Sequence, residues 1–127
     1  MIAAVDVVAR QSIFKSWAVS VTGFVHAVRT ERNVGLVCAF MLIAIVISAL
    51  LRISVIEWVI VVLCCAIVLV TELLNTAIEA VTDLGCEERH PLAKIAKDTA
   101  AAATLIASVS SLIIAVLIFG PRLLALL

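Results

Sequence analysis

The most constraining feature of this sequence is a set of three long stretches without a charged side chain. They cover residues 34–51, 58–71 and 99–119, and the second continues with helical spacing to Asp83. A helix needs about 20 residues to cross a bilayer, and lipid offers its backbone no outside hydrogen-bond partner. We therefore predict an all-α integral membrane protein with spans at about 34–51, 58–83 and 99–119. The second span includes a cytoplasmic extension, and Gly120 with Pro121 is expected to end the third helix.

Composition supports this fold class and excludes others. Of the 127 residues, 65% are hydrophobic and 14% are charged. Soluble domains are about 45–50% apolar, so an ordinary soluble domain is excluded, and so is a disordered chain. Nine basic residues balance nine acidic ones, which leaves no basic surface for nucleic acid.

The segment before the first span has an amphipathic pattern. Apolar side chains recur there at helical spacing: Phe14, Trp17, Val21, Phe24 and Val28. Lys15 and Arg29 flank this row. The pattern predicts an amphipathic helix over about residues 5–30 that lies on the membrane surface. A solvent-exposed helix that packs on its own bundle fits the same periodicity.

The basic residues predict an orientation. Seven of the nine fall before the first span or after the second: Arg10, Lys15, Arg29, Arg32, Arg89, Lys94 and Lys97. Only Arg52 and Arg122 fall on the opposite side. Because basic residues favour the cytoplasmic side, the N-terminus and the loop after the second span are expected in the cytoplasm, where ATP is present.

A polar stripe runs along the second span and its extension. This carboxylate stripe consists of Glu72, Asn75, Thr76, Glu79 and Asp83, whose spacing places them on one helix face. A carboxylate as deep in a span as Glu72 is costly and indicates function by default. The alternative is that Glu72 and Glu79 form structural ion pairs with Lys97 or Arg32.

The stripe has the parts of a phosphoryl-transfer site. Carboxylates suit Mg²⁺, which binds one or two of them together with substrate phosphates, and a desolvated carboxylate can act as a general base. Glu31, Lys97 and Asp98 are expected at the same interfacial level, where the lysine would neutralise a phosphate. The sequence contains no Gly-rich nucleotide-binding loop.

Several motifs resemble those of a known family. Glu72-Leu-Leu-Asn-Thr-Ala-Ile-Glu79, then Asp83, then His90-Pro-Leu-Ala-Lys-Ile-Ala-Lys97-Asp98 resembles the signature of the prokaryotic diacylglycerol kinase family. Phe14-Lys-Ser16, Thr30-Glu-Arg-Asn33 and Ile56-Glu-Trp58 resemble its undecaprenol kinase branch. The resemblance extends over roughly residues 10 to 120.

This resemblance implies a single membrane-embedded lipid kinase domain over residues 1–127, in a homotrimer with shared active sites in the bacterial plasma membrane. Such an enzyme transfers the γ-phosphoryl group of Mg-ATP to the hydroxyl of a membrane lipid. Undecaprenol is the preferred acceptor, and diacylglycerol is the alternative. From a different class, a non-enzymatic oligomeric channel or holin-like protein would use Glu72 for ions or gating.

The resemblance also assigns roles to residues. Glu72 matches the catalytic base and Asn75 the residue that supports it, while Glu31 and Glu79 match the Mg²⁺ ligands. The ATP-binding positions are Glu31, Glu79, Glu88, Arg89, His90, Lys97 and Asp98, and Lys97 also has a catalytic role. Ser16, Trp17 and Glu72 match the lipid-binding region, and Asp83 has a supporting role. The chain departs from the family pattern at Ser12, Val37 and Ala102.

Overall fold

A computed structural model describes residues 13–85 and 90–126. These residues form four helices and no strand: α1 (Ile13–Thr30), α2 (Arg32–Leu50), α3 (Val55–Gly85) and α4 (Pro91–Leu124). Three of them, α2, α3 and α4, are long and apolar enough to cross a membrane. The predicted all-α membrane fold, with an N-terminal helix before three spans, is confirmed.

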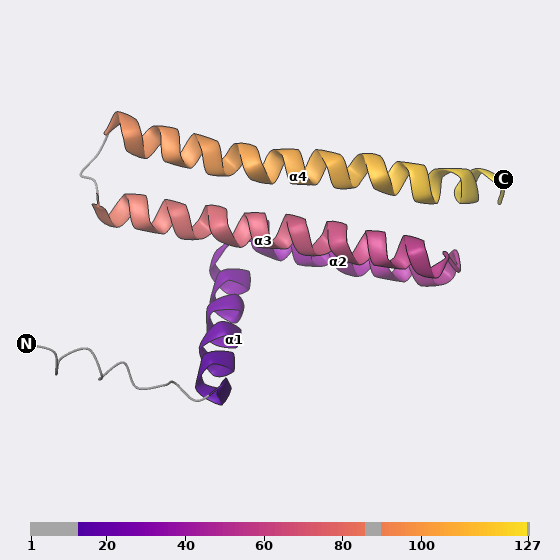
Figure 1. The fold of residues 1–127 in the computed structure, drawn as a ribbon, viewed down its shortest axis with the longest axis horizontal. Helices are drawn as coiled ribbons and strands as arrows, with labels where there is room; N and C mark the ends of the chain where they lie inside the picture. Colours follow the sequence, from indigo (N-terminus) through magenta and orange to yellow (C-terminus); the bar gives the residue numbers. More distant parts are fainter. Residues whose placement is uncertain (1–12, 86–89, 127) are drawn as a thin grey trace, which may run out of the picture.

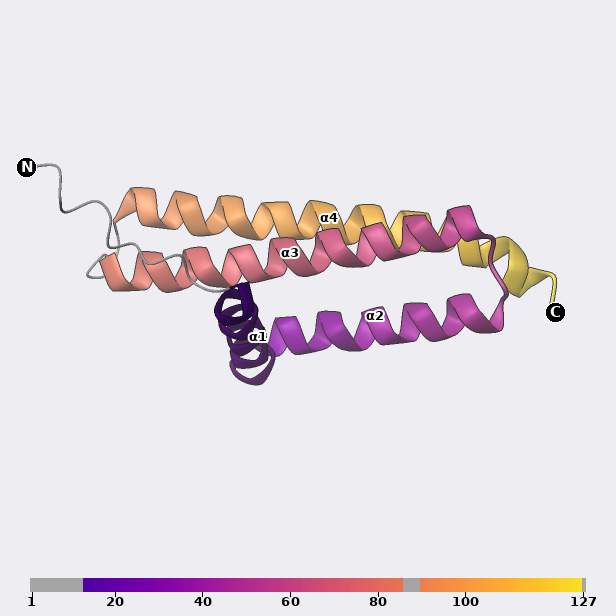
Figure 2. The same ribbon diagram turned by 60° about the horizontal axis from the view of Figure 1, so that its bottom comes forward.

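The three long helices lie side by side, and α1 lies across their common direction (Figure 1). Helix α3 packs along α4 and also contacts α2, while α1 packs mainly against α2. The start of α2 lies beside the middle of α3, so that α3 and α4 extend together beyond α1 (Figure 2). This crosswise placement is the one expected of a surface helix. Residues 5–12 of the predicted surface helix lie outside the described residues.

Helix α4 is longer than the apolar stretch 99–119 at both ends. It begins at Pro91, where a missing N–H costs nothing, and the His90 side chain accepts a hydrogen bond from the Leu92 N–H at 3.3 Å. The expectation that Gly120 and Pro121 end this helix is wrong, because it continues to Leu124. Pro121 removes one backbone donor, but the next residue, Arg122, is held to α3 by an ion pair with Glu57.

The buried apolar core lies where the α2–α3 turn meets the C-terminal part of α4. Ile53, Val61, Ile118 and Phe119 form it. Elsewhere most large apolar side chains of α2, α3 and α4 are exposed. In a membrane, lipid or another protein chain covers such surfaces, and this exposure is what separates the fold from a soluble bundle.

Candidate active site

The carboxylate stripe lies along α3, and its two innermost members are buried. Glu72 is 4% exposed and Asn75 is 9% exposed. Glu79 is partly buried and Asp83 is exposed. The helical period therefore carries the stripe from the interior of the bundle outward to its surface, as the sequence predicts.

Asn75 is bonded to Glu79 and not to Glu72. Its Nδ2 donates to Glu79 Oε1 at 3.0 Å, one helical turn further along α3. Its Oδ1 is buried and has no hydrogen-bond partner within the described part of the chain. The sequence analysis expects Asn75 to support Glu72. In the structure its amide group instead orients the carboxylate of Glu79.

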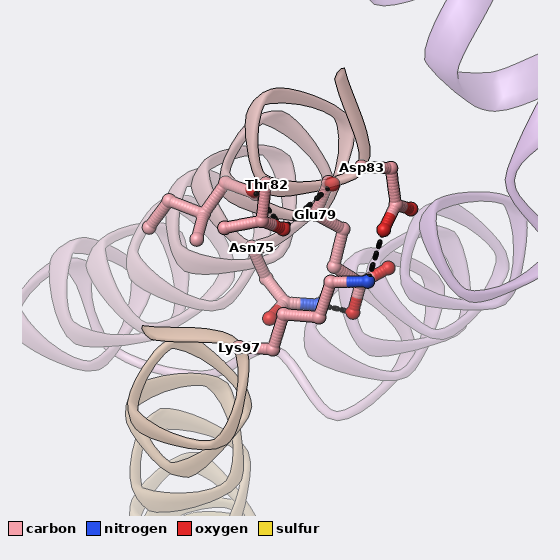
Figure 3. Close-up of polar contacts among 6 residues, drawn as sticks. Asn75, Glu79, Thr82, Asp83 and Lys97 are labelled. Atoms are coloured by element: carbon pink, nitrogen blue, oxygen red, sulfur yellow. Dashed lines mark hydrogen bonds and ion pairs between the residues drawn. The ribbon is translucent and has the colours of Figure 1, made fainter. Parts of the chain in front are cut away.

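Lys97 connects α4 to the outer end of the stripe. Its ammonium group pairs with Asp83, as Figure 3 shows together with the bond between Asn75 and Glu79. The neighbouring Asp98 is exposed and pairs with Lys94 at 2.6 Å. In residues 13–85 and 90–126, neither Glu72 nor Glu79 takes part in an ion pair. The structure therefore gives no support to the alternative in which Lys97 or Arg32 neutralises them.

A cavity of about 590 Å³ lies between α2, α3 and α4, and its wall is mostly apolar. Glu72 is part of this wall, and Asn33 at the start of α2 is another polar member. From there the cavity runs toward the buried core, where Ala115 and Phe119 line it. Its wall also includes Val37. The arrangement offers an apolar chain a site with a carboxylate in its wall.

Oxygen atoms suitable for a hard cation occur on the stripe and at the start of α2. Glu31 is half-buried at the N-terminal cap of α2 and makes no side-chain capping bond. Within the described ranges, no three His, Cys, Asp or Glu side chains form a group that could hold a metal ion. Mg²⁺ needs only one or two carboxylates when substrate phosphates complete its shell. Glu31, Glu79 and the unpartnered Asn75 Oδ1 fit that requirement by their chemistry.

The remaining predicted positions are more scattered. Trp17 is 70% exposed on α1, next to the exposed Ser16, and neither residue lines the cavity. His90 caps α4. Glu88 and Arg89 lie outside the described residues.

Sequence reasoning missed the hydroxyl groups in the cavity wall. Ser108 and Ser111 line the cavity together with Thr104. The signal was available, because offsets of four and seven residues place the three hydroxyls on one face of a helix.

Known proteins resemble this chain over most of its length. A model of the prokaryotic diacylglycerol kinase family matches residues 18–119. The undecaprenol kinase of Bacillus subtilis (strain 168) is 43% identical over 110 residues, which cover 87% of this chain and 89% of that protein.

Two diacylglycerol kinases are also similar in sequence to this chain. The protein from Synechocystis sp. is 36% identical over 113 residues, which cover 88% of this chain and 62% of the relative. The protein from Pseudomonas aeruginosa is 37% identical over 95 residues, which cover 75% of this chain and 77% of the relative. This chain therefore belongs to the prokaryotic diacylglycerol kinase family and is a lipid kinase.

Proposed function

We propose that this lipid kinase transfers the γ-phosphoryl group of ATP to the hydroxyl group of undecaprenol. The observation that carries the proposal is the position of Glu72, a buried carboxylate in the wall of an apolar cavity inside the bundle. No described side chain forms a hydrogen bond or an ion pair with it. A carboxylate in such a place requires a partner, and the hydroxyl end of an apolar alcohol supplies one.

In the proposed reaction, the oxygen of the lipid alcohol attacks the γ-phosphorus of ATP. The new O–P bond forms as the bond from the γ-phosphorus to the β–γ bridging oxygen breaks, and ADP leaves. Glu72 accepts the proton of the alcohol and later releases it to water. Lys97, positioned by its ion pair with Asp83, donates a further hydrogen bond to the transferring group and stabilises its charge. Confinement of the alcohol to the membrane plane supplies the positioning.

The proposal assigns Mg²⁺ to Glu31 and Glu79, with the Asn75 amide holding the Glu79 carboxylate in place. When bound, the ion would screen the negative charge of the ATP phosphates. The nucleotide itself would be held by Glu31, Glu79, Lys97 and Asp98, and by the segment that includes Glu88, Arg89 and His90.

The active site is proposed to face the cytoplasm of a bacterial cell. The distribution of basic residues supports this orientation, and so does α1, which lies across the bundle with Trp17 exposed. Lipid would enter past Ser16 and Trp17. A homotrimer with shared active sites is also part of the proposal, and the exposed apolar surfaces of the long helices supply area that neighbouring subunits could cover.

The acceptor has a second candidate, diacylglycerol. Undecaprenol is favoured because the relative that shares 43% identity over nearly its whole length is an undecaprenol kinase. Diacylglycerol remains a candidate because the relatives from Synechocystis sp. and Pseudomonas aeruginosa are diacylglycerol kinases. Mixed micelles that contain both alcohols and labelled ATP decide between them, because each phosphorylated product is separated and counted. Exclusive labelling of diacylglycerol would overturn the preference for undecaprenol.

Replacement of Glu72 by Gln tests the role of this carboxylate. The amide keeps the size of the side chain but cannot accept the proton, so we expect kcat to fall by at least about a hundredfold. The oligomeric state and the melting temperature should stay as in the wild type. A purified Glu72→Gln protein that phosphorylates lipid at the wild-type rate would show that Glu72 is not the base. Ion flux through vesicles without ATP-dependent lipid labelling would instead favour a channel.

A further inference from the structure

Two ion pairs show the register between α3 and α4. Asp83 pairs with Lys97 at one end of the antiparallel pair, and Glu57 pairs with Arg122 near the other end. Glu72 lies eleven residues before Asp83, and Ser108 lies eleven residues after Lys97. At 1.5 Å per residue, both positions are about 16 Å from the first ion pair. Glu72 and Ser108 therefore lie at the same level on adjacent helices.

Both residues also line the cavity. Glu72 and Ser108 belong to its wall, which is otherwise mostly apolar. The structure records no hydrogen bond between them and no other side-chain bond for either within residues 13–85 and 90–126. Glu72 is thus a hydrogen-bond acceptor and Ser108 a hydrogen-bond donor at the same level of the cavity, and neither has a partner among the described residues.

Several hydroxyls of the chain form a hydrogen bond to a carbonyl of their own helix. Ser48 donates to the Ala44 carbonyl at 2.7 Å, and Thr71 donates to the Val68 carbonyl at 2.9 Å. Serine and threonine in helices commonly satisfy themselves in this way. Ser108 and Ser111 both line the cavity and make no such bond within the described residues, and of the two Ser108 lies level with Glu72. In a membrane an unpaired polar group is costly.

We propose that Ser108 is an acceptor-binding residue, whose hydroxyl donates a hydrogen bond to the oxygen of the lipid alcohol while that alcohol donates to Glu72. The inference rests on the proposed function and adds to it a second point of attachment for the reacting group. One lone pair of the alcohol oxygen accepts from Ser108, and the other remains for attack on phosphorus. An alcohol bridged in this way satisfies Glu72 and Ser108 at once.

Replacement of Ser108 by Ala removes the hydroxyl without opening a new cavity, because the two side chains are nearly equal in size. The full-length protein is assayed in mixed micelles with undecaprenol and, in parallel, with diacylglycerol. Because one hydrogen bond to the substrate is lost, we expect KM for the alcohol that the enzyme phosphorylates to rise by about three- to tenfold. We expect kcat to stay within about twofold, and KM for ATP to be unchanged.

Two further variants separate binding from packing. Ser108→Thr keeps a hydroxyl donor and should restore the wild-type KM for the alcohol. Ser110 lies two residues away on α4, is exposed and does not line the cavity, so Ser110→Ala is the matched control and should behave as wild type. A Ser108→Ala protein with an unchanged KM for the alcohol would overturn the inference alone. An equal effect of Ser110→Ala would overturn it as well.

The same experiment distinguishes a failure of this inference from a failure of the proposed function. A wild-type protein that phosphorylates neither alcohol overturns both. If the wild type phosphorylates diacylglycerol and not undecaprenol, the preferred acceptor is wrong. The Ser108 variants then still test the hydrogen bond from Ser108 to the free hydroxyl of diacylglycerol.

Discussion

The two ends of the α3–α4 pair contain similar groups but satisfy them differently. At the end near the α2–α3 turn, Glu57 Oε2 lies 2.7 Å from Arg122 Nη2 and 2.7 Å from the Ser54 backbone nitrogen. The Ser54 hydroxyl accepts in return from the Glu57 N–H at 3.3 Å, which completes a capping box at the start of α3. Arg122 also donates to the Ile118 carbonyl at 2.8 Å. Glu57 and Arg122, the two members of this ion pair, are thus satisfied within the chain.

The end that carries the carboxylate stripe leaves groups without partners. Glu72 is buried and has no ion pair in the described part of the protein, and the Asn75 Oδ1 atom is buried without a bond there. Lys97 has a partner, but this partner is the exposed Asp83. The comparison teaches that a partly buried ion pair satisfied within the chain stabilises the fold, whereas buried polar groups without partners are where substrates are expected to bind.

The largest contrast is expected from the same substitution, Glu to Gln, at the two ends. Glu79→Gln removes a proposed Mg²⁺ ligand while it keeps a group that can bond to Asn75. We expect kcat/KM to fall by about a hundredfold or more, with an increased Mg²⁺ requirement. Assays of lipid phosphorylation over a Mg²⁺ titration measure both. A Glu79→Gln protein with the wild-type Mg²⁺ dependence would remove Glu79 from the metal site.

Glu57→Gln is the matched change at the satisfied end. It weakens the ion pair with Arg122 that holds the part of α4 beyond Pro121, so we expect the melting temperature in detergent to fall by several degrees. The value of kcat/KM at a temperature where the protein is folded should stay within about twofold. If activity fell as far as in Glu79→Gln at an unchanged melting temperature, the distinction between the two ends would be wrong.

The smallest effect is expected from Asp83→Asn. The side chain of Asp83 is 68% exposed and that of Lys97 is 37% exposed, so water screens their pairing, and stability should change by less than about 1 kcal/mol. Because Asp83 positions Lys97 near the proposed nucleotide, KM for ATP should rise by about threefold. Steady-state kinetics with varied ATP test this, and an unchanged KM for ATP would limit Asp83 to a surface role.

The sequence alone predicts much of this architecture. Stretches without charge long enough to cross a bilayer must be helical in lipid, so the three spans follow from composition and length. The helical period places Glu72, Asn75 and Glu79 on one face, because residues three, four and seven apart share a face of any α-helix. Both deductions use only interactions between near neighbours in the chain.

What the sequence did not determine is which groups meet across helices. Lys97 pairs with Asp83, α4 continues beyond Pro121 because Arg122 reaches Glu57, and Ser108 lies level with Glu72 on the cavity wall. Each of these depends on the register between two antiparallel helices. That register is set by the packing of side chains distant in sequence, about which the period of a single helix carries no information, so only the tertiary structure decided it.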